Sequence, residues 1–467
     1  MPIIGFHAFC DICFDYICRI MENNRSVFIE TYGCQMNVYD SEVVLSVLGT
    51  VGYKPCGSLE EADLILVNTC SIRENAEQRV WGRLDRFLVE KKKRSVTVGV
   101  LGCMAERLKQ ELLSHPAVDL VAGPDSYRHL PSMLGRLEAS GEKQMEIRLS
   151  RMETYSDILP VRTDRNGVTS FISIMRGCNN MCTYCIVPYV RGSERSRDPN
   201  SIVKEAKTLY EQGYKEVCLL GQNVDSYLWT DPANPTETVN FAQLLELVAL
   251  VAPDLRVRFS TSHPKDMGNG VLYTMAMYPN ICTHIHLPVQ SGSDRMLEKM
   301  NRKYTVEKYM DRVEKIREII PDASITTDII AGFCSETEED HAATVELMKK
   351  VRFDSAFMFQ YSERPDTKAA RHFPDDVPLE TKTRRLNEII ELQSGISLES
   401  NRKCVGSVYE VLVEGTSKRD SGSLFGRTLG NKVCVFPAEG RKPGDYVKVL
   451  VESCTSATLL GRIVDTM

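Results

Sequence analysis

Three apolar runs in the N-terminal third each precede a stretch of helical character. The runs are residues 26–31, 62–67 and 95–101, and the helical stretches are 41–51, 72–90 and 105–114. Continuous runs of Val, Ile and Leu that alternate with helices are typical of parallel strands covered on both faces. The sequence therefore predicts a parallel α/β domain over residues 26–150, preceded by an uncertain extension at 1–25.

A cysteine follows each of the three apolar runs. Cys34, Cys70 and Cys103 are 36 and 33 residues apart, about one βαβ unit each. The carboxyl ends of parallel strands share one edge of the sheet, where open α/β sheets bind ligands. A single cysteine at such a place is often a small buried core residue. Three cysteines in equivalent positions favour a site made of three thiolates.

The middle of the chain, over residues 160–395, repeats a strand-then-helix order six times. The candidate strands are 170–175, 216–220, 256–260, 282–287, 324–330 and 355–360. Candidate helices lie between them at 199–212, 240–250, 266–278, 294–319 and 337–350. This order is typical of a parallel barrel. Six units fall short of eight, so we expect an open, partial (β/α)6 barrel with its functional residues at the carboxyl ends of the strands.

A tight cysteine motif follows the first of these six strands. Cys178, Cys182 and Cys185 have the spacing C-x3-C-x2-C. Thiolates in short loops are the usual ligands of iron–sulfur clusters. A zinc site and a redox thiol set are the alternatives, although zinc motifs usually contain two C-x2-C pairs. A cubane with three protein ligands leaves one iron open, and this motif resembles the signature of radical S-adenosylmethionine (SAM) enzymes.

The other strand ends of the barrel are polar and rich in turn residues. Their backbone amides and small hydroxyls are candidates to hold a nucleoside and its carboxylate, although ordinary turn chemistry explains the same residues. The candidate cofactor-binding residues are Tyr184, Gly221, Gln222, Asn223, Ser260, Ser262, Gln290, Ser291 and Asp328. Arg191, Arg195 and Arg197 follow the cysteine motif, where they either meet phosphates or form a solvated charge run.

The last part of the chain, residues 400–467, reads as five short strands separated by glycine-containing turns. This spacing favours a small antiparallel barrel of the oligonucleotide-binding type. Residues 401–467 hold ten basic and seven acidic residues, a net charge of +3, against −6 for the whole chain. The basic candidates for RNA contact are Lys418, Arg419, Arg427, Lys432, Arg441 and Lys442. A scaffold barrel with solvated lysines is the alternative.

Composition narrows the class of protein. Apolar residues make up 43% and charged residues 26%, both ordinary for a globular protein. No stretch approaches the roughly 20 apolar residues that span a bilayer, and the first residues make a poor signal peptide. Sixteen cysteines without an export signal indicate a reducing compartment, so we expect a cytoplasmic protein.

Cys10 and Cys13 form a C-x2-C pair, which is typical of metal sites, but no second pair lies nearby and a metal site there is therefore disfavoured.

Taken together, residues 26–465 resemble the methylthiotransferase family of radical SAM enzymes. The segments 68–76 and 175–192 are similar to the MiaB branch, which acts on tRNA. Sister branches act on a threonylcarbamoyl-adenosine tRNA or on an aspartate of a ribosomal protein, and these are the alternative functions. Cys334 stands where the family usually has proline in Gly-Phe-Pro, a change expected to alter only the local shape of a turn.

The resemblance implies two [4Fe–4S] clusters. Cys178, Cys182 and Cys185 would hold the cluster that binds SAM, and Cys34, Cys70 and Cys103 would hold an auxiliary cluster carrying the sulfur to be donated. Two SAM molecules would be used per turnover, one as methyl donor and one as the source of a 5′-deoxyadenosyl radical. The product would be 2-methylthio-N6-isopentenyladenosine in tRNA, and the last 68 residues would form a TRAM domain.

The same resemblance implies partners. They are the tRNA anticodon stem-loop, with its target adenosine 3′ of the anticodon, and a low-potential electron donor such as flavodoxin or ferredoxin. The implied protein is a monomer with no membrane partner, and its sulfur donor is not identified by the sequence.

Overall fold

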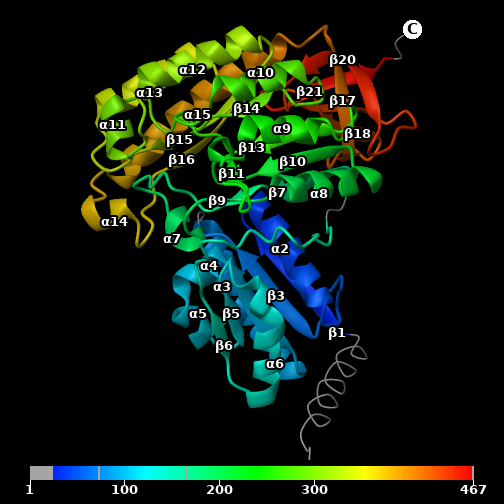
Figure 1. The fold of residues 1–467 in the computed structure, drawn as a ribbon. Coiled ribbons are helices and arrows are strands. Elements are labelled where there is room, and N and C mark those ends of the chain that lie inside the picture. Colours follow the sequence, from blue (N-terminus) through cyan, green and yellow to red (C-terminus); the bar gives the residue numbers. More distant parts are fainter. Residues whose placement is uncertain (1–24, 72–73, 164–165, 465–467) are drawn as a thin grey trace, which may run out of the picture. The chain divides into compact units, whose positions relative to one another are not determined.

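An N-terminal unit is built on six parallel strands (Figure 1). The computed structural model describes residues 25–71, 74–163 and 166–464, so the expected extension with Cys10 and Cys13 lies outside the described residues. The strands are β1 (Arg25–Tyr32), β2 (Tyr53–Pro55), β3 (Leu64–Thr69), β4 (Thr97–Gly102), β5 (Leu120–Ala122) and β6 (Gln144–Glu146). Their order is β2-β1-β3-β4-β5-β6, with every neighbouring pair parallel. The predicted parallel α/β domain is confirmed.

Helices connect these strands and bury their apolar side chains. They are α2 (Gln35–Gly49), α3 (Glu74–Lys93), α4 (Cys103–Leu108), α5 (Gln110–Ser114) and α6 (Leu130–Ser140). Val67 and Val100 of the sheet pack with Leu84 and Phe87 of α3 in one core. The single helix predicted over 105–114 is divided at Lys109, whose φ of 44° is left-handed. The short helix α7 (Val187–Arg191), although distant in sequence, belongs to this same unit and contacts α4.

The second unit contains the six predicted parallel strands of the partial barrel. They are β7 (Thr169–Ser173), β10 (Glu216–Leu220), β13 (Arg256–Ser260), β14 (His284–His286), β15 (Ser324–Ala331) and β16 (Ser355–Gln360). They form two parallel sheets with the orders β13-β10-β7 and β14-β15-β16. A parallel bridge between Val257 and Ile281 connects the two sheets. Within the described strands, β7 and β16 each pair with one neighbour, which leaves the barrel open.

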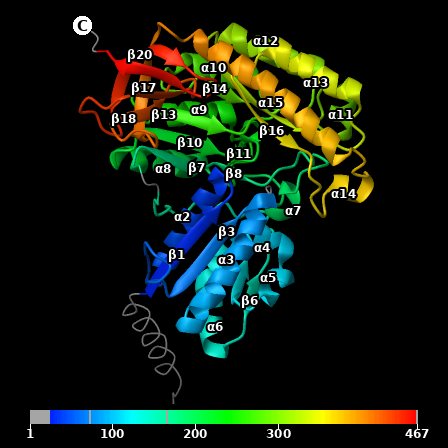
Figure 2. The same cartoon turned by 180° about the vertical axis from the view of Figure 1, so that it is seen from behind.

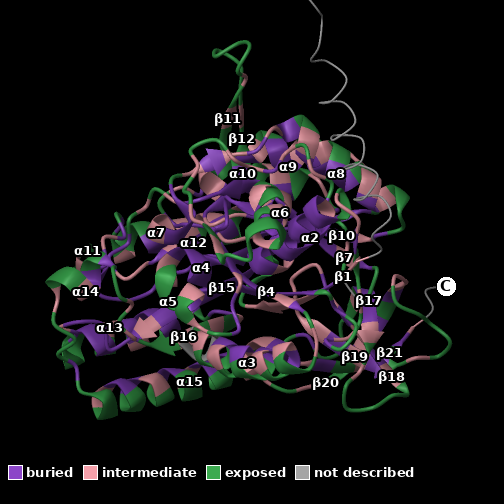
Figure 3. Cartoon of the chain, turned by 90° about the horizontal axis from the view of Figure 1, so that it is seen from below, coloured by how far each residue is buried: buried purple, intermediate pink, exposed green. Residues whose placement is uncertain are grey.

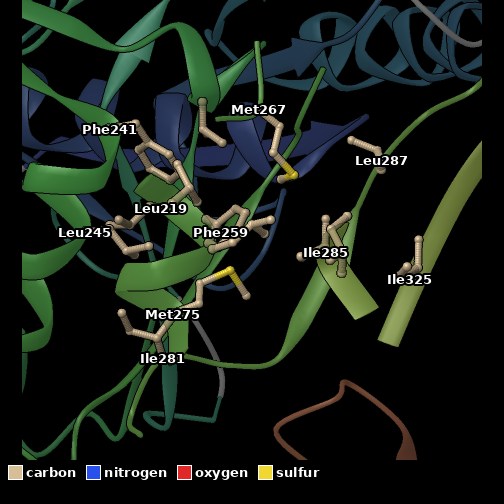
Figure 4. Packing of buried hydrophobic residues seen from close by; sticks show 14 of the residues in the cluster. Leu219, Phe241, Leu245, Phe259, Met267, Met275, Ile281, Ile285, Leu287 and Ile325 are labelled. Atoms are coloured by element: carbon tan, nitrogen blue, oxygen red, sulfur yellow. The ribbon is translucent and has the colours of Figure 1, made fainter. Parts of the chain in front are cut away.

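All helices of this unit except the short one at 368–372 contribute residues to the core on one face of these sheets. The helices are α8 (Pro199–Glu211), α9 (Phe241–Ala249), α10 (Asn269–Met277), α11 (Asp294–Lys299), α12 (Val306–Ile319), α13 (Glu338–Val351), α14 (Lys368–His372) and α15 (Leu379–Arg402). Figure 4 shows Leu219, Phe259 and Ile285 of the strands packed in the same core as Phe241 and Met275 of the helices. The long helix α15 lies along β16 (Figure 2).

Two features of this unit were not predicted. The helix expected over 294–319 is wrong: α11 and α12 are separated by a turn in which Asn301 and Lys303 adopt positive φ angles of 58° and 65°. A hairpin of β11 (Leu228–Thr230) and β12 (Thr238–Asn240) projects with an exposed tip (Figure 3). No helix in the described part of the chain is long and apolar enough to cross a membrane.

The C-terminal strands close into the predicted small barrel. They are β17 (Val408–Thr416), β18 (Ser423–Arg427), β19 (Val433–Pro437), β20 (Tyr446–Cys454) and β21 (Leu459–Ile463). Four neighbouring pairs are antiparallel, and the β19–β21 pair that completes the barrel is parallel. Closure removes the unpaired strand edges that an open sheet of this size would expose.

Two buried arginines of β13 attach the small barrel to the larger one. Arg256 donates to the backbone oxygen of Arg427 at 2.8 Å. Arg258 is paired with Glu216 at 3.0 Å and also donates to the backbone oxygen of Thr428 at 3.4 Å. Because each guanidinium is buried and donates to fixed acceptors, these hydrogen bonds set the orientation of the small barrel on β13 as well as stabilising its attachment.

Candidate metal centres

The cysteines Cys34, Cys70 and Cys103 lie at the carboxyl ends of three adjacent strands. Cys34 is the N-cap of α2 after β1, Cys70 follows β3, and Cys103 begins α4 after β4. The backbone N–H of Cys70 donates to the oxygen of Tyr32 at 3.1 Å, which ties the first two turns together. Gly33 has a φ of 136°, and a Cβ added there would lie 2.5 Å from the Cβ of Cys70. The close approach of these two turns therefore requires glycine.

Polar side chains surround this first set of thiols. A hydrogen bond with the Cys70 side chain lowers the pKa of Cys34 to about 6, whereas burial raises the pKa of Cys103. The thiol of Cys34 also donates to Asn37 Oδ1 at 3.2 Å. Asn37 in turn donates to Asn68 Oδ1 at 3.2 Å, so two buried asparagines hold the Cys34 thiol in place at this edge of the sheet.

Arg191 brings a buried positive charge to the same thiols. It is 4% exposed, donates to Asp40 Oδ2 at 2.8 Å, and acts on the pKa values of Cys34 and Cys103 as the nearby cation. The expectation that Arg191, Arg195 and Arg197 meet phosphates or form a solvated run is wrong. Arg195 is buried and lies opposite Arg176 in a pair of short antiparallel strands. Arg197 is ion-paired with Glu205 at 2.5 Å. The charge pattern of residues 191–197 does not show burial, and the partner of Arg191 lies 151 positions away in the sequence, so the pattern alone was misleading.

The second set, Cys178, Cys182 and Cys185, lies in the loop after β7 and the short strand β8 (Met175–Arg176). The N–H of Cys185 donates to the oxygen of Cys182 at 3.0 Å, closing a turn that brings these two residues together. Burial raises the pKa of Cys178 to about 11. A coordinated metal offsets such a shift, because a coordinating thiol is deprotonated outright.

The turn between α11 and α12 supports this loop. Thr183 N–H donates to the oxygen of Met300 at 3.0 Å, and Asn301 Nδ2 donates to the oxygen of Met181 at 2.9 Å. Arg302, which is 5% exposed, donates from Nη1 to Cys182 Sγ at 3.3 Å and from Nη2 to the oxygen of Pro288 at 2.9 Å. Sequence reasoning missed Arg302 because it treated 294–319 as one helix. The only local signal was the polar Asn-Arg-Lys triplet within it.

The candidate cofactor-binding residues lie near the carboxyl ends of the barrel strands. Gly221 follows β10, and a Cβ there would approach the side chain of Met175. Ser260 ends β13, and Ser262 donates its N–H to the oxygen of His286 at 3.2 Å. Gln222 is half-buried, and Tyr184 packs edge-to-face against Phe333 with ring centroids 6.3 Å apart.

Others in this group already have protein partners. Asn223 Nδ2 donates to Asp266 at 2.7 Å, and Ser291 contacts Thr344 at 3.3 Å. Gln290 has a φ of 73° and donates its N–H to the oxygen of Asp328 at 2.8 Å. The carboxylate of Asp328 lies 3.3 Å from His286 Nε2. Asn223 and Ser291 therefore shape their turns through protein contacts.

Cys334 is fully buried in an apolar cluster with Phe333 and Tyr361.

Two basic residues expected at an RNA surface instead serve the fold. Arg427 is ion-paired with Glu414, and Lys432 is paired with Asp354 at 2.9 Å. Lys418, Arg419, Arg441 and Lys442 remain exposed. Among the described residues, no three His, Cys, Asp or Glu side chains are grouped to hold a single metal ion.

Three regions of the chain match known families. Residues 26–123 match "Uncharacterized protein family UPF0004", residues 172–348 the radical SAM superfamily, and residues 402–464 the TRAM domain. A protein of Bacteroides fragilis named tRNA-2-methylthio-N(6)-dimethylallyladenosine synthase is 55% identical over 96% of this chain and 98% of its own length. The chain belongs to the tRNA-2-methylthio-N(6)-dimethylallyladenosine synthase family. The synthase of Porphyromonas gingivalis is 52% identical over 95% of this chain and 96% of its own length.

Solved structures agree with the fold of this synthase family member. The radical SAM methyltransferase TsrM from Kitasatospora setae, with cobalamin and a [4Fe–4S] cluster bound, gives a TM-score of 0.57 at 14% identity, covering 83% of this chain and 77% of that one. The cobalamin-dependent radical enzyme OxsB gives 0.52 at 12% identity, covering 82% and 57%. At these identities the likeness concerns the fold alone. The radical SAM domain itself implies one [4Fe–4S] cluster and SAM for this synthase family member.

Proposed function

We propose that this protein is a radical SAM tRNA methylthiotransferase. It adds a methylthio group to C2 of N6-isopentenyladenosine, the adenosine 3′ of the anticodon, to form 2-methylthio-N6-isopentenyladenosine. The observation that carries the proposal is 55% identity to a synthase of this name over 96% of the chain, a span that includes both cysteine sets and the C-terminal barrel. Methylthiolation of a threonylcarbamoyl-adenosine tRNA or of a ribosomal-protein aspartate finds no comparable support.

The donors of both cysteine sets fit iron–sulfur clusters. Cys178, Cys182 and Cys185 supply three thiols from one loop, and Cys34, Cys70 and Cys103 supply three from adjacent strand ends. Each set has one buried guanidinium beside it, which balances the negative charge of bound thiolates. When bound, the two clusters would supply SAM cleavage and the sulfur to be donated, with two SAM molecules used per turnover.

The surrounding residues position the reactants. Arg302 holds Cys182 in orientation, and Arg191 with Asp40 does the same for the thiols of the N-terminal unit. We assign SAM to the turns that contain Tyr184, Gly221, Gln222, Ser260, Ser262, Gln290 and Asp328, with Asn223 and Ser291 setting the shape of two of them. The exposed Lys418, Arg419, Arg441 and Lys442 are assigned to the tRNA backbone. A flavodoxin-like or ferredoxin-like electron donor, a monomeric state and a cytoplasmic location complete the proposal.

The test is the nucleoside content of tRNA. Deleting the gene should remove 2-methylthio-N6-isopentenyladenosine from digested bulk tRNA and leave N6-isopentenyladenosine in its place, as measured by liquid chromatography and mass spectrometry. Plasmid-borne wild-type protein should restore the methylthio nucleoside. Unchanged levels of the methylthio nucleoside in the deletion strain would reject the proposed function.

Replacing Gly33 by alanine should remove iron from the N-terminal unit. The new Cβ would lie 2.5 Å from the Cβ of Cys70 at a φ of 136°, so the two cysteine-bearing turns must move apart. Anaerobically reconstituted protein should hold about four irons in place of about eight. Gly49→Ala is the matched control, because a Cβ there meets nothing within 4 Å. A full iron complement in Gly33→Ala would show that the turns tolerate the side chain.

Replacing Arg302 by glutamine should lower the reduction potential of the cluster held by Cys178, Cys182 and Cys185. The variant loses a positive charge and a hydrogen bond to Cys182 Sγ, both of which favour the reduced, more negative cluster. A charged hydrogen bond is worth about 1.5–3 kcal/mol, so a shift of up to about 65–130 mV in this one-electron couple is expected. Redox titration followed by electron paramagnetic resonance measures it. Arg295→Gln, which removes an exposed arginine of α11 paired with Asp340, should leave the potential unchanged.

A further inference from the structure

The sheet β14-β15-β16 has two chemically different faces. Ile285, Ile325 and Ile329 belong to the apolar core beneath the helices, and two of them are visible in Figure 4. Because side chains alternate along a strand, their neighbours point to the opposite face. That inner face carries His286, Thr326, Asp328, Ile330, Phe357 and Phe359. The register places Phe357 beside Asp328 and Phe359 beside Ile330.

Two aromatic rings on this inner face are open to solvent. Phe357 is 55% exposed and Phe359 is 43% exposed, and both belong to the edge strand β16. The ring of His286 meets Phe357 edge-on at 5.8 Å, and His286 Nε2 lies 3.3 Å from Asp328. The exposed faces thus form a short aromatic wall bordered by a carboxylate and an imidazole. Neighbouring exposed phenylalanines are unusual on a protein surface and commonly mark a binding site.

The wall is continuous with the loop that carries the second cysteine set. Ile330, beside Phe359, packs against the apolar cluster of Phe333 and Tyr361. Tyr184, which lies between Cys182 and Cys185 in the sequence, packs against the same cluster. A flat ligand stacked on Phe357 and Phe359 would therefore lie on the sheet face that leads to the carboxyl ends of β15 and β16 and to this loop.

We infer that Phe357 and Phe359 bind the N6-isopentenyladenine base of the substrate tRNA. This inference rests on the proposed function and names the surface that receives its target. Nucleobases stack on aromatic side chains, and a base that is modified on its ring must leave the helical stack to be reached. The isopentenyl group adds an apolar surface that the second ring can cover. The adenine of SAM offers the same flat ring without the isopentenyl group, and that difference separates the two ligands.

The test compares two anticodon stem-loops that differ only in the isopentenyl group. Equilibrium binding to the reconstituted holoenzyme, followed by fluorescence anisotropy, gives the preference of each variant for the modified loop. Stacking on one ring is worth about 1–3 kcal/mol, so Phe357→Ala or Phe359→Ala should weaken binding of the modified loop by about 5- to 150-fold. The unmodified loop should be affected less, so the preference should fall.

Two further variants sharpen the measurement. Phe357→Leu keeps an apolar side chain without an aromatic face and should lose part of the affinity, whereas Tyr273→Ala removes an exposed ring of α10 from the opposite side of the core and should change nothing. Thermal unfolding should shift only slightly in all of them, because the replaced rings are 43–55% exposed.

Four outcomes bear on this inference and on the function it rests on. An unchanged preference for the isopentenyl group in both alanine variants would overturn the inference. A raised KM for SAM with that preference intact would assign the rings to the cofactor and overturn it as well. If the wild-type holoenzyme forms no methylthio product from the modified loop, the proposed function fails first. If the wild type is active while the variants bind as it does, this inference alone fails.

Discussion

Replacing Cys70 by alanine should abolish the methylthio product while 5′-deoxyadenosine continues to form from SAM. Cys70 lies between Cys34 and Cys103 at the edge of the N-terminal sheet, so its loss removes the central thiol of that set. Residues 178–185 belong to the other unit and keep their three cysteines. Because changes to residues that merely orient a metal ligand cost 10–100-fold, loss of a ligand should reduce product by more than about 100-fold.

The measurement follows both products in one reaction. Deoxyadenosine and methylthio-nucleoside are quantified after anaerobic reconstitution with a reductant, SAM and modified stem-loop. Cys56→Ala is the matched control, because Cys56 is a half-buried cysteine of the same unit that lies away from the three strand ends. Loss of deoxyadenosine in the Cys70 variant alone would show that the two cysteine sets do not divide the work as proposed.

Replacing Cys182 by alanine should abolish both products. The substitution removes a thiol from the C-x3-C-x2-C loop together with the acceptor of the Arg302 hydrogen bond, which leaves a buried guanidinium with one partner fewer. SAM cleavage should fall by more than about 100-fold. About four irons, those of the N-terminal set, should remain in the protein.

Cys454→Ala serves as the control for this second experiment, because Cys454 is a half-buried cysteine of the small barrel. It should keep full iron and full activity. Deoxyadenosine formation at the wild-type rate by the Cys182 variant would contradict the assignment of this loop to SAM cleavage.

The regular parts of this fold were predictable because their chemistry is local. A run such as residues 64–69 is apolar at almost every position, which is what a parallel strand with two buried faces requires. The same reasoning placed Cys34, Cys70 and Cys103 on one edge, since parallel strands end on the same side. The C-x3-C-x2-C motif could be recognised from its spacing alone, without any prediction of the fold. What these patterns establish is position, and the ligand roles of the six cysteines stay predictions until iron is measured.

The features that were missed depend on contacts between distant residues. Arg191 reads as a surface charge until Asp40, 151 positions away, supplies its partner. Arg427 and Lys432 read as RNA contacts until Glu414 and Asp354 pair with them. The helix predicted over 294–319 is interrupted at Asn301 and Lys303, which adopt left-handed backbone conformations. Neither residue type has a helix propensity low enough for the sequence to predict this interruption. Phe357 and Phe359 read as ordinary strand residues because exposure is a property of the assembled sheet.

The placement of residues 187–193 within the N-terminal unit has a consequence for biosynthesis. A nascent chain emerges from the ribosome in order, so the first 163 residues are complete well before Arg191 appears. Until then Asp40, which is fully buried in the finished protein, lacks its cation. Removing one partner of such a pair costs about 3–5 kcal/mol, a large part of the stability of a domain of this size. The N-terminal unit therefore cannot finish folding until residues 187–193 have been translated, and a fragment cut at residue 163 would lack the cation that pairs with Asp40.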